Sequence, residues 1–416
     1  MNSNNILDEV FEKFFNNVKI FKDREVLRHD YLPDRLPHRE EQIKRLGETV
    51  APVLKDAKCS NIFIYGKTGT GKTAVTQYVL NHLEAKTKEF NAPIRFHFIN
   101  CRLAGTEYRV FASLSQSIGV RVPFTGLSVG EVFDRFRAGL DSSKIIFIIV
   151  LDEIDALIKA RGDILLYELT RINETLRNSK VSLIGISNDL RLKEFLDPRV
   201  LSSLGEEEIV FRPYDASELK NILFERVHLA FCDEALSEGA LGLCAALAAA
   251  EHGDARRALD LLRVAGEVAE RKDANIVVEE HVREAESRIE HNRVVEALRN
   301  LTLHSKLVIL SVFHLGRANV HRAITGEIYE VYSELCEELG LTPLTQRRVS
   351  TLINELDAVG LLNARVISMG RYGRTKKIRL EVMRTLIRGV FTNDNRLGRL
   401  VKYEPKCLSK QASGRR

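Results

Sequence analysis

A glycine-rich loop between a strand pattern and a helix pattern has the residue types of a phosphate-binding site. Its glycines let successive N–H groups point at phosphate oxygens, and the helix that follows adds its positive dipole end. Lys72 would reach the β and γ phosphates of a nucleotide, and the Thr73 hydroxyl would ligate Mg²⁺. A glycine turn that binds nothing is the alternative, which the combination of strand, loop and helix disfavours. The loop is Gly66, Lys67, Thr68, Gly69, Thr70, Gly71, Lys72 and Thr73.

Two carboxylates follow a continuous β-branched run at 145–151. Such a run predicts a strand buried on both faces of a parallel sheet, and ligands bind beyond the carboxyl ends of such strands. Asp152 would hold Mg²⁺ directly or through water, and Glu153 would orient and deprotonate an attacking water. A solvated acidic turn is the alternative. The spacing of about eighty residues after the phosphate-binding loop favours the catalytic interpretation.

Three more polar residues stand at positions suited to nucleotide chemistry. Asn188 follows the apolar run 181–187, where its amide would hydrogen-bond the γ-phosphate or the attacking water. Arg199 begins a short helix after Pro198. Arg256 lies in the first turn of a predicted helix, where an arginine opposes the helix dipole. A bound phosphate is one explanation for Arg256, and a solvated arginine is the other.

The elements that must position these residues are parallel strands and crossover helices. We expect strands at 61–65, 92–100, 145–151, 181–187 and 206–211. The segment Leu36, Pro37, His38 and Arg39 enters just before the first strand and is placed near the adenine, with a helix N-terminus that binds no ligand as the alternative. Between 101 and 144 we expect two helices whose connecting loop carries Arg121, Phe124 and Thr125; this loop is either a plain turn or a contact loop.

Composition restricts the class of protein. The chain has 416 residues, 44% of them hydrophobic, which predicts two or three globular domains. No apolar run approaches a membrane span and the N-terminus lacks the pattern of a secretory signal, so we expect a cytoplasmic protein without a membrane partner. Six cysteines without a C-x-x-C pair argue against a zinc site and a disulfide framework.

Positive charge is concentrated at the C-terminal end. Residues 363–416 contain fifteen Lys or Arg and three Asp or Glu, a balance of +12, whereas the other residues sum to −7. Three amphipathic helix patterns before this stretch and a glycine-rich hairpin at its start predict a winged helix-turn-helix. A protein-binding winged helix with a solvated hairpin is the alternative. The predicted DNA-binding residues are Thr345, Gln346, Arg347, Arg348 and Ser350 on the third helix, and Arg371, Tyr372, Gly373, Arg374 and Lys376 on the hairpin, which also carries Lys377.

The order of these motifs, together with GDARRAL at 253–259 and GRYGRTK at 370–376, resembles the archaeal replication initiators, AAA+ proteins related to the origin recognition complex large subunit and its helicase-loading cofactor. The resemblance covers nearly the whole chain. It implies an α/β AAA+ P-loop ATPase core with a five-stranded parallel sheet at 1–213, an α-helical lid at 214–298 and a winged-helix DNA-binding domain at 299–416. Asn188 is then similar to sensor one, Arg256 to the cis-acting sensor two, and Arg199 to an arginine finger offered to a neighbouring subunit.

The resemblance also implies partners and cofactors. ATP or ADP with Mg²⁺ would occupy the site, with Leu36 to Arg39, Pro213 and Tyr214 around the adenine. Residues 120–128 look like the family's DNA-touching insertion, although Arg121 is their only basic residue. We expect a slowly hydrolysing, nucleoid-associated initiator that binds double-stranded origin DNA, an identical or paralogous subunit and the minichromosome maintenance helicase. Alternatives are a AAA+ motor or clamp-loader-like ATPase, although no Ser-Arg-Cys motif is present, and a winged-helix transcriptional regulator.

Overall fold

The computed structural model describes residues 19–90, 92–123, 125–204, 207–320, 322–368 and 374–408. The chain divides into two compact units, Met1–Ala285 and Glu286–Arg416, so that the boundary falls inside helix α13 (Glu279–Asn300). Each unit is described by itself. The finer division of the first unit into an ATPase core and a lid stays a prediction.

The centre of the first unit is an all-parallel sheet of five strands in the order β2-β3-β4-β1-β5. The five strands predicted from sequence are confirmed, each within one or two residues of its expected ends. The three central strands are almost entirely buried because both faces of the sheet are covered by helices. The strands are β1 (Ile62–Gly66), β2 (Ile94–Asn100), β3 (Ile146–Asp152), β4 (Lys180–Ser187) and β5 (Glu207–Phe211).

The strand register brings the polar ends of the strands to one edge. Asn100 pairs with Asp152, and Tyr65 on β1 pairs with Ser187 on β4. Because all strands run in the same direction, the phosphate-binding loop after β1, the carboxylates after β3 and Asn188 after β4 all leave the sheet at its carboxyl edge.

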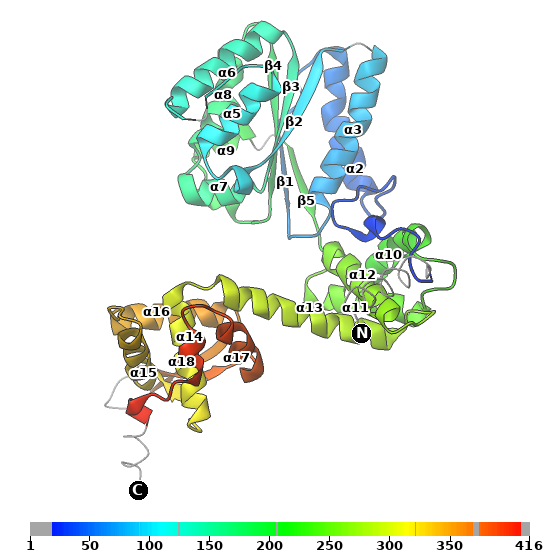
Figure 1. Cartoon of the computed structure of the whole chain (residues 1–416). Coiled ribbons are helices and arrows are strands. Elements are labelled where there is room, and N and C mark those ends of the chain that lie inside the picture. The colour runs from blue at the N-terminus through cyan, green and yellow to red at the C-terminus, as the bar shows by residue number, and fades with distance from the viewer. Residues whose placement is uncertain are drawn as a thin grey trace, which may run out of the picture. The chain divides into compact units, whose positions relative to one another are not determined.

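Helices form a layer on each face of this sheet (Figure 1). Apolar side chains of α2 and α3 make one core with β1, β3 and β4, and those of α5 to α9 make a second core on the opposite face. The 101–144 segment contains the two expected helices and a short additional one, α4. The helices are α2 (Glu40–Val50), α3 (Lys72–Phe90), α4 (Cys101–Ala104), α5 (Glu107–Ser117), α6 (Val129–Ser143), α7 (Ile154–Arg161), α8 (Ile164–Arg171) and α9 (Pro198–Leu204), with 3-10 helices η1 (Glu25–Leu27), η2 (Ala51–Lys55), η3 (Ile172–Glu174) and η4 (Leu192–Phe195).

The part of this unit that follows β5 is helical. Its helices are α10 (Ala216–Ala230), α11 (Glu238–Glu251), α12 (Ala255–Arg271) and the first part of α13. The N-terminal segment packs onto these helices: Phe21 forms a bridge with Phe231 and fits against Gly266, where a side chain would have no room. Arg226 on α10 donates to the carbonyls of Val26 and Tyr31. These contacts fasten residues 21–31 to α10 and α12.

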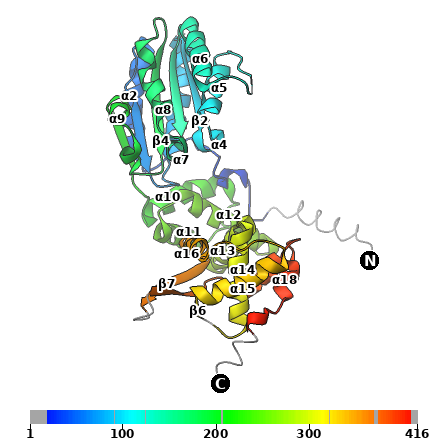
Figure 2. The same cartoon turned by 90° about the vertical axis from the view of Figure 1, so that its left-hand side faces the viewer.

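The second unit is a winged helix, as predicted. Three helices and a three-stranded antiparallel sheet of order β6-β8-β7 share one core, and Figure 2 shows strand β7 reaching outward from the helices. The short strand β6 and two C-terminal helices were not expected from sequence. The elements are α14 (Leu303–Arg317), β6 (Ala323–Ile324), α15 (Thr325–Glu338), α16 (Gln346–Ala358), β7 (Leu362–Ser368), β8 (Arg374–Leu380), α17 (Arg384–Thr392) and α18 (Gly398–Lys402).

The structure describes the state of the cysteines and the apolarity of the helices. All six cysteines are free thiols. Across the part of the chain that the structure describes, none of the helices combines the length and the apolarity that crossing a bilayer requires.

Candidate functional site

Hydrogen bonds within the glycine-rich loop hold it in one conformation. Lys72 donates from Nζ to the carbonyls of Gly66 and Lys67, both at 2.7 Å, and the Thr70 hydroxyl donates to the Lys67 carbonyl at 2.8 Å. Gly69 and Gly71 have φ values of 72° and 89°, which L side chains rarely adopt. Burial lowers the pKa of Lys72 to about 8, against the attraction of Asp152. A phosphate beside this ammonium group would favour its charged form.

The two predicted Mg²⁺ ligands touch each other. The Thr73 hydroxyl at the start of α3 donates to Oδ2 of Asp152 at 2.8 Å. A hydroxyl and a carboxylate are the hard oxygen donors that Mg²⁺ takes, together with phosphate oxygens and water. Among the described residues no cluster of three or more His, Cys, Asp or Glu could hold a metal by itself, so nucleotide oxygens would have to complete the shell.

Glu153 has a left-handed backbone, with φ 51° and ψ 41°, at the junction of β3 and α7. A non-glycine residue in this region costs about 1–3 kcal/mol, and such residues gather at functional sites. Its carboxylate lies 3.8 Å from the Arg102 guanidinium on α4. The conformation turns α7 away immediately after Asp152, so both carboxylates border the same cavity.

Asn188 is positioned by a carboxylate on the neighbouring helix. Asp155 on α7 accepts from the Asn188 N–H at 3.0 Å and from the Ser187 hydroxyl at 3.3 Å. The carboxyl ends of β3 and β4 are thereby tied together, and Asn188 borders the cavity that contains Asp152 and Glu153.

The helix α12 meets the glycine loop directly. Ala255 donates its N–H to the Gly69 carbonyl at 3.1 Å, and Asp254 caps α12 by accepting from the N–H groups of Arg256 and Arg257. A Cβ on Gly69 would stand 1.7 Å from the Asp254 carboxylate, so only glycine permits this contact. Arg256 in the first turn of α12 therefore enters the same cavity as Lys72.

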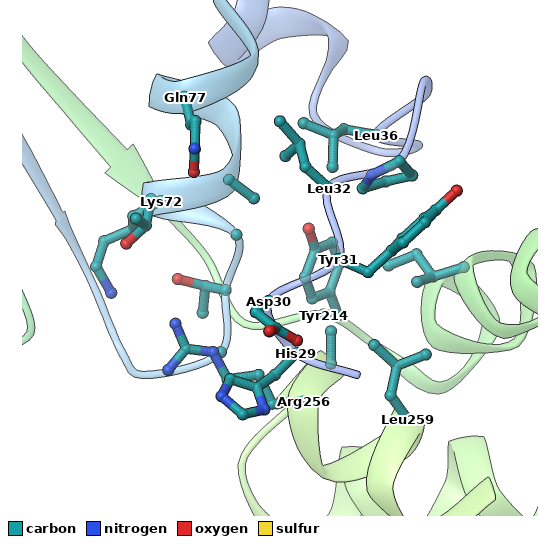
Figure 3. A pocket seen from close by; sticks show the side chains of 18 of the residues that line it. His29, Asp30, Tyr31, Leu32, Leu36, Lys72, Gln77, Tyr214, Arg256 and Leu259 are labelled. Atoms are coloured by element: carbon teal, nitrogen blue, oxygen red, sulfur yellow. The ribbon is translucent and has the colours of Figure 1, made fainter. Parts of the chain in front are cut away.

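These groups surround one cavity of about 490 Å³. Figure 3 shows Lys72 and Gln77 on one side, Tyr31, Leu32 and Leu36 of the N-terminal segment opposite, and Arg256 and Leu259 of α12 below. A phosphate-binding half thus continues into an apolar half of suitable character for a base. The lining residues are 29–33, 35–37, 68–74, Gln77, Asp152, Glu153, Asn188, Tyr214, Ile222, Glu225, Arg226, Ala255, Arg256 and Leu259.

Of the predicted adenine surround, Leu36, Pro37 and Tyr214 line this cavity, whereas His38 and Arg39 lie beside it. The Arg39 side chain is 1% exposed and bonded to backbone. It donates from Nε to the Thr70 carbonyl (2.9 Å), from Nη1 to the His38 carbonyl (2.9 Å) and from Nη2 to the Arg212 carbonyl (2.8 Å). Its guanidinium carbon is 3.7 Å from the centroid of the Tyr214 ring. The arginine thus fastens the glycine loop to the end of β5.

Arg199 does not line the cavity of its own chain. It is 73% exposed on α9, and Asp197 accepts from its Nε and Nη2 at 3.1 Å. The Tyr167 ring lies 5.6 Å from its guanidinium carbon. The side chain is therefore held in one orientation at the protein surface.

The predicted DNA-binding residues of the third winged-helix helix are grouped at its N-terminal end. Thr345 caps α16, and Thr345, Gln346, Arg347 and Arg348 are exposed. Ser350 is half-buried and accepts a hydrogen bond from Lys376 on β8. In the first unit Arg121 and Thr125 are exposed on the loop between α5 and α6. Phe124, Arg371, Tyr372 and Gly373 lie outside the described residues, and Arg374 is described only as the first residue of β8.

Sequence reasoning missed part of the cavity wall. Residues 29–33, Arg35 and three residues of α10 line it, yet none follows a recognisable phosphate-binding pattern; the α10 residues are Ile222, Glu225 and Arg226. A signal existed for the first group, since the same pre-strand segment was already placed near the base. The sequence contains no signal for the three α10 residues, because whether they reach the cavity depends on how α10 packs.

Family models and sequence relatives match successive parts of this chain. A model of the AAA domain matches residues 55–192, the Cdc6 AAA+ ATPase-type lid domain 220–287, and the CDC6 C-terminal winged helix domain 296–389. The ORC1-type DNA replication protein of Pyrococcus abyssi is 53% identical over 392 residues, covering 93% of this chain and 94% of the relative. That of Thermococcus onnurineus is 51% identical over 397 residues, covering 94% and 96%.

A solved structure agrees with these sequence relatives. The Aeropyrum pernix ORC1 protein in complex with DNA superposes with a TM-score of 0.85 at 50% identity, over 92% of this chain and 100% of that one. Fold, domain models and relatives over nearly the full length coincide: the chain belongs to the ORC1/Cdc6 family of AAA+ replication initiators.

Proposed function

We propose that this protein is an ATP-controlled initiator that binds Mg²⁺-ATP in the cavity of the first unit, hydrolyses it slowly, and binds double-stranded origin DNA. The observation that carries the nucleotide part is the convergence of four separate stretches on one cavity: the glycine loop, Asp152 with Glu153, Asn188, and Arg256 from α12. A glycine turn without a ligand would not need the last three.

The residues divide the chemistry of phosphoryl transfer between them. Lys72 and the loop N–H groups hold the β and γ phosphates, and Thr73 and Asp152 would hold Mg²⁺, which neutralises phosphate charge when bound. Glu153 orients the attacking water and accepts its proton, while the Asn188 amide donates to the γ-phosphate or aligns the water. Arg256 adds positive charge from the lid, which makes the position of α12 depend on the phosphates present.

Arg199 acts on a different nucleotide in this proposal. It is exposed and absent from the lining of its own cavity, and Asp197 and Tyr167 orient it. These features suit an arginine offered to the nucleotide of an adjacent identical or paralogous subunit. Arg199→Ala should leave ATP binding by the isolated chain unchanged and lower hydrolysis only under conditions where subunits assemble on DNA.

The proposal that the protein binds duplex DNA is based on exposed basic residues of the second unit. The exposed N-terminal end of α16 carries Arg347 and Arg348, and β8 carries Lys377, which is exposed as well. The loop at 120–128 of the first unit is proposed as a second DNA contact. The Aeropyrum pernix relative was solved in complex with DNA. By analogy we propose that the ATP-bound protein also recruits the minichromosome maintenance helicase.

Fluorescence anisotropy of labelled duplexes with the full-length protein across a salt series tests the DNA proposal. Arg347→Ala should weaken binding of an origin duplex and reduce its preference over a scrambled duplex, as expected for a lost base contact. Lys44→Ala, a charge loss at an exposed α2 site, should change neither. Sequence-independent binding that collapses equally with salt for every duplex would favour a non-specific tether on a motor ATPase.

The nucleotide proposal is tested separately with fluorescent ADP and a phosphate-release assay. Lys72→Ala should abolish tight binding because it removes the charge that faces the phosphates.

Helicase recruitment is tested by loading purified helicase onto an origin duplex with ATP, ADP or no nucleotide. Loading that is independent of this protein would refute that part of the proposal.

A further inference from the structure

Lys376, which is predicted to contact DNA, is bonded to helix α16 within the protein. Lys376 on β8 donates from Nζ to Asn354 Oδ1 at 2.6 Å, to Ser350 Oγ at 2.9 Å and to the Ser350 carbonyl at 3.3 Å. An ammonium group has three donors, and all three are directed at α16. The side chain thus connects the second strand of the wing to two successive turns of the helix.

The contact fixes the polarity of two side chains on α16. An ammonium group only donates, so the atom of Asn354 that faces it must be the amide oxygen, and the NH₂ group points away from the lysine. Ser350 is likewise an acceptor toward Lys376, which turns its hydroxyl hydrogen elsewhere. Because Asn354 is exposed, its NH₂ group is the part of the amide that is presented to whatever approaches the helix.

Arg347 adds further donors to this face of the helix, on which Thr351 directs its hydroxyl hydrogen to the Arg347 carbonyl. Arg347 lies one turn before Ser350 and Thr351, on the side of α16 that carries Asn354, and is exposed. A guanidinium has five donors and no acceptor. We infer that Lys376 is a positioning residue that presets the NH₂ group of Asn354 as a hydrogen-bond donor, so that α16 selects, at the base that Asn354 meets, an edge made of acceptors. This inference rests on the proposed binding of duplex DNA by α16.

The hydrogen-bonding groups of the bases determine which base a donor on α16 would favour. Guanine offers two acceptors, O6 and N7, in the major groove, and thymine offers O4. An asparagine that reads adenine needs both its oxygen and its NH₂ group, because adenine presents an acceptor and a donor together. With its oxygen engaged by Lys376, Asn354 is set to favour guanine or thymine over adenine at the base it meets.

The neighbouring lysine supplies a matched control. Lys377 has the same charge and is exposed, and because side chains alternate along a strand it points to the opposite face of β8. Lys376→Met and Lys377→Met each remove one positive charge from the same strand. Only the first removes the contact with α16.

The experiment selects bound sequences from a randomised duplex pool with the full-length wild type, Lys376→Met and Lys377→Met. The wild type and Lys377→Met should enrich the same motif, with guanine or thymine at the position under Asn354. Lys376→Met should accept adenine there, because the freed amide can rotate and both donate and accept. Enrichment of the wild-type motif by Lys376→Met would overturn the inference.

A second variant covers the case in which Lys376→Met disturbs the wing. Asn354→Ala should bind the enriched duplex about fivefold more weakly and a scrambled duplex with unchanged affinity, since a directed hydrogen bond is lost. Equal binding of the enriched duplex by Asn354→Ala and wild type would also overturn the inference. If the wild type enriches no sequence at all, the proposed DNA-binding function itself fails, which is a distinct result.

Discussion

Replacement of Arg39 by methionine tests whether this residue fastens the glycine loop or contacts nucleotide. The side chain is 1% exposed and donates to the carbonyls of Thr70, His38 and Arg212. Methionine has a similar unbranched stem and no donor. One buried and two partly buried carbonyls would lose this donor, and the buried one belongs to the glycine loop.

The size of the effect follows from those three bonds. A buried carbonyl without a partner costs about 1 kcal/mol or more, and the two partly buried carbonyls cost less because water can reach them, which gives about 2 kcal/mol in total. Loss of the stacking on Tyr214 adds about 1 kcal/mol, and relief of the guanidinium's own desolvation offsets a similar amount. Burial indeed lowers the pKa of Arg39, the direction expected for a desolvated cation. A loss of about 2 kcal/mol corresponds to a fall in melting temperature of about 4 °C for a unit of this size.

Dye-reported thermal unfolding of the nucleotide-free protein measures this loss, because the chain contains no tryptophan. Arg39→Lys keeps the charge but not the planar fork, so it should recover only part of the stability. Fluorescent ADP should bind Arg39→Met at least tenfold more weakly, since the loop is less well held. An unchanged melting temperature without nucleotide, combined with weakened ADP binding, would show that Arg39 contacts the nucleotide and would refute the fastening role.

Three further outcomes follow from the geometry. Glu153→Gln should bind ADP like the wild type and release no phosphate in a turnover assay; hydrolysis at the parental rate would show that another group activates the water. Gly69→Ala should weaken ADP binding more than tenfold, because its Cβ would meet the Asp254 carboxylate. The control Gly340→Ala should bind ADP normally, because Gly340 has a similar φ of 67° and open space around it. Equal ADP affinities of the two variants would mean that the contact between the glycine loop and α12 is dispensable. Burial lowers the pKa of His314 to about 4 from 6.5, so the unfolded state takes up the proton first as the pH falls. Stability from this group is present above pH 6.5 and decreases by about 2 kcal/mol at pH 5. Urea unfolding at pH 7.5 and 5 should show this decrease, and His314→Gln should remove that part of it.

Local chemistry made much of the fold and site predictable. The glycine loop, the β-branched runs and the polar residue after each run are short-range signals, and parallel strands bring their carboxyl ends to one edge by construction. The five strands and the gathering of Lys72, Asp152, Glu153 and Asn188 follow from them. The winged helix was equally accessible, because its helices and hairpin are contiguous in sequence.

Cationic side chains show where sequence reasoning ends. Arg39 and Lys376 are basic residues within motifs that suggest ligand contact, and the sequence alone therefore predicted nucleotide for one and DNA for the other. The structure bonds Arg39 to the carbonyl of Arg212, 173 positions away, and Lys376 to Asn354, 22 positions away. A cation has the same sequence signature whether its partner is a phosphate or a protein oxygen. These protein partners are brought to the cations by long-range packing, so only the tertiary structure could reveal them, and the predicted contacts with nucleotide and DNA stay predictions.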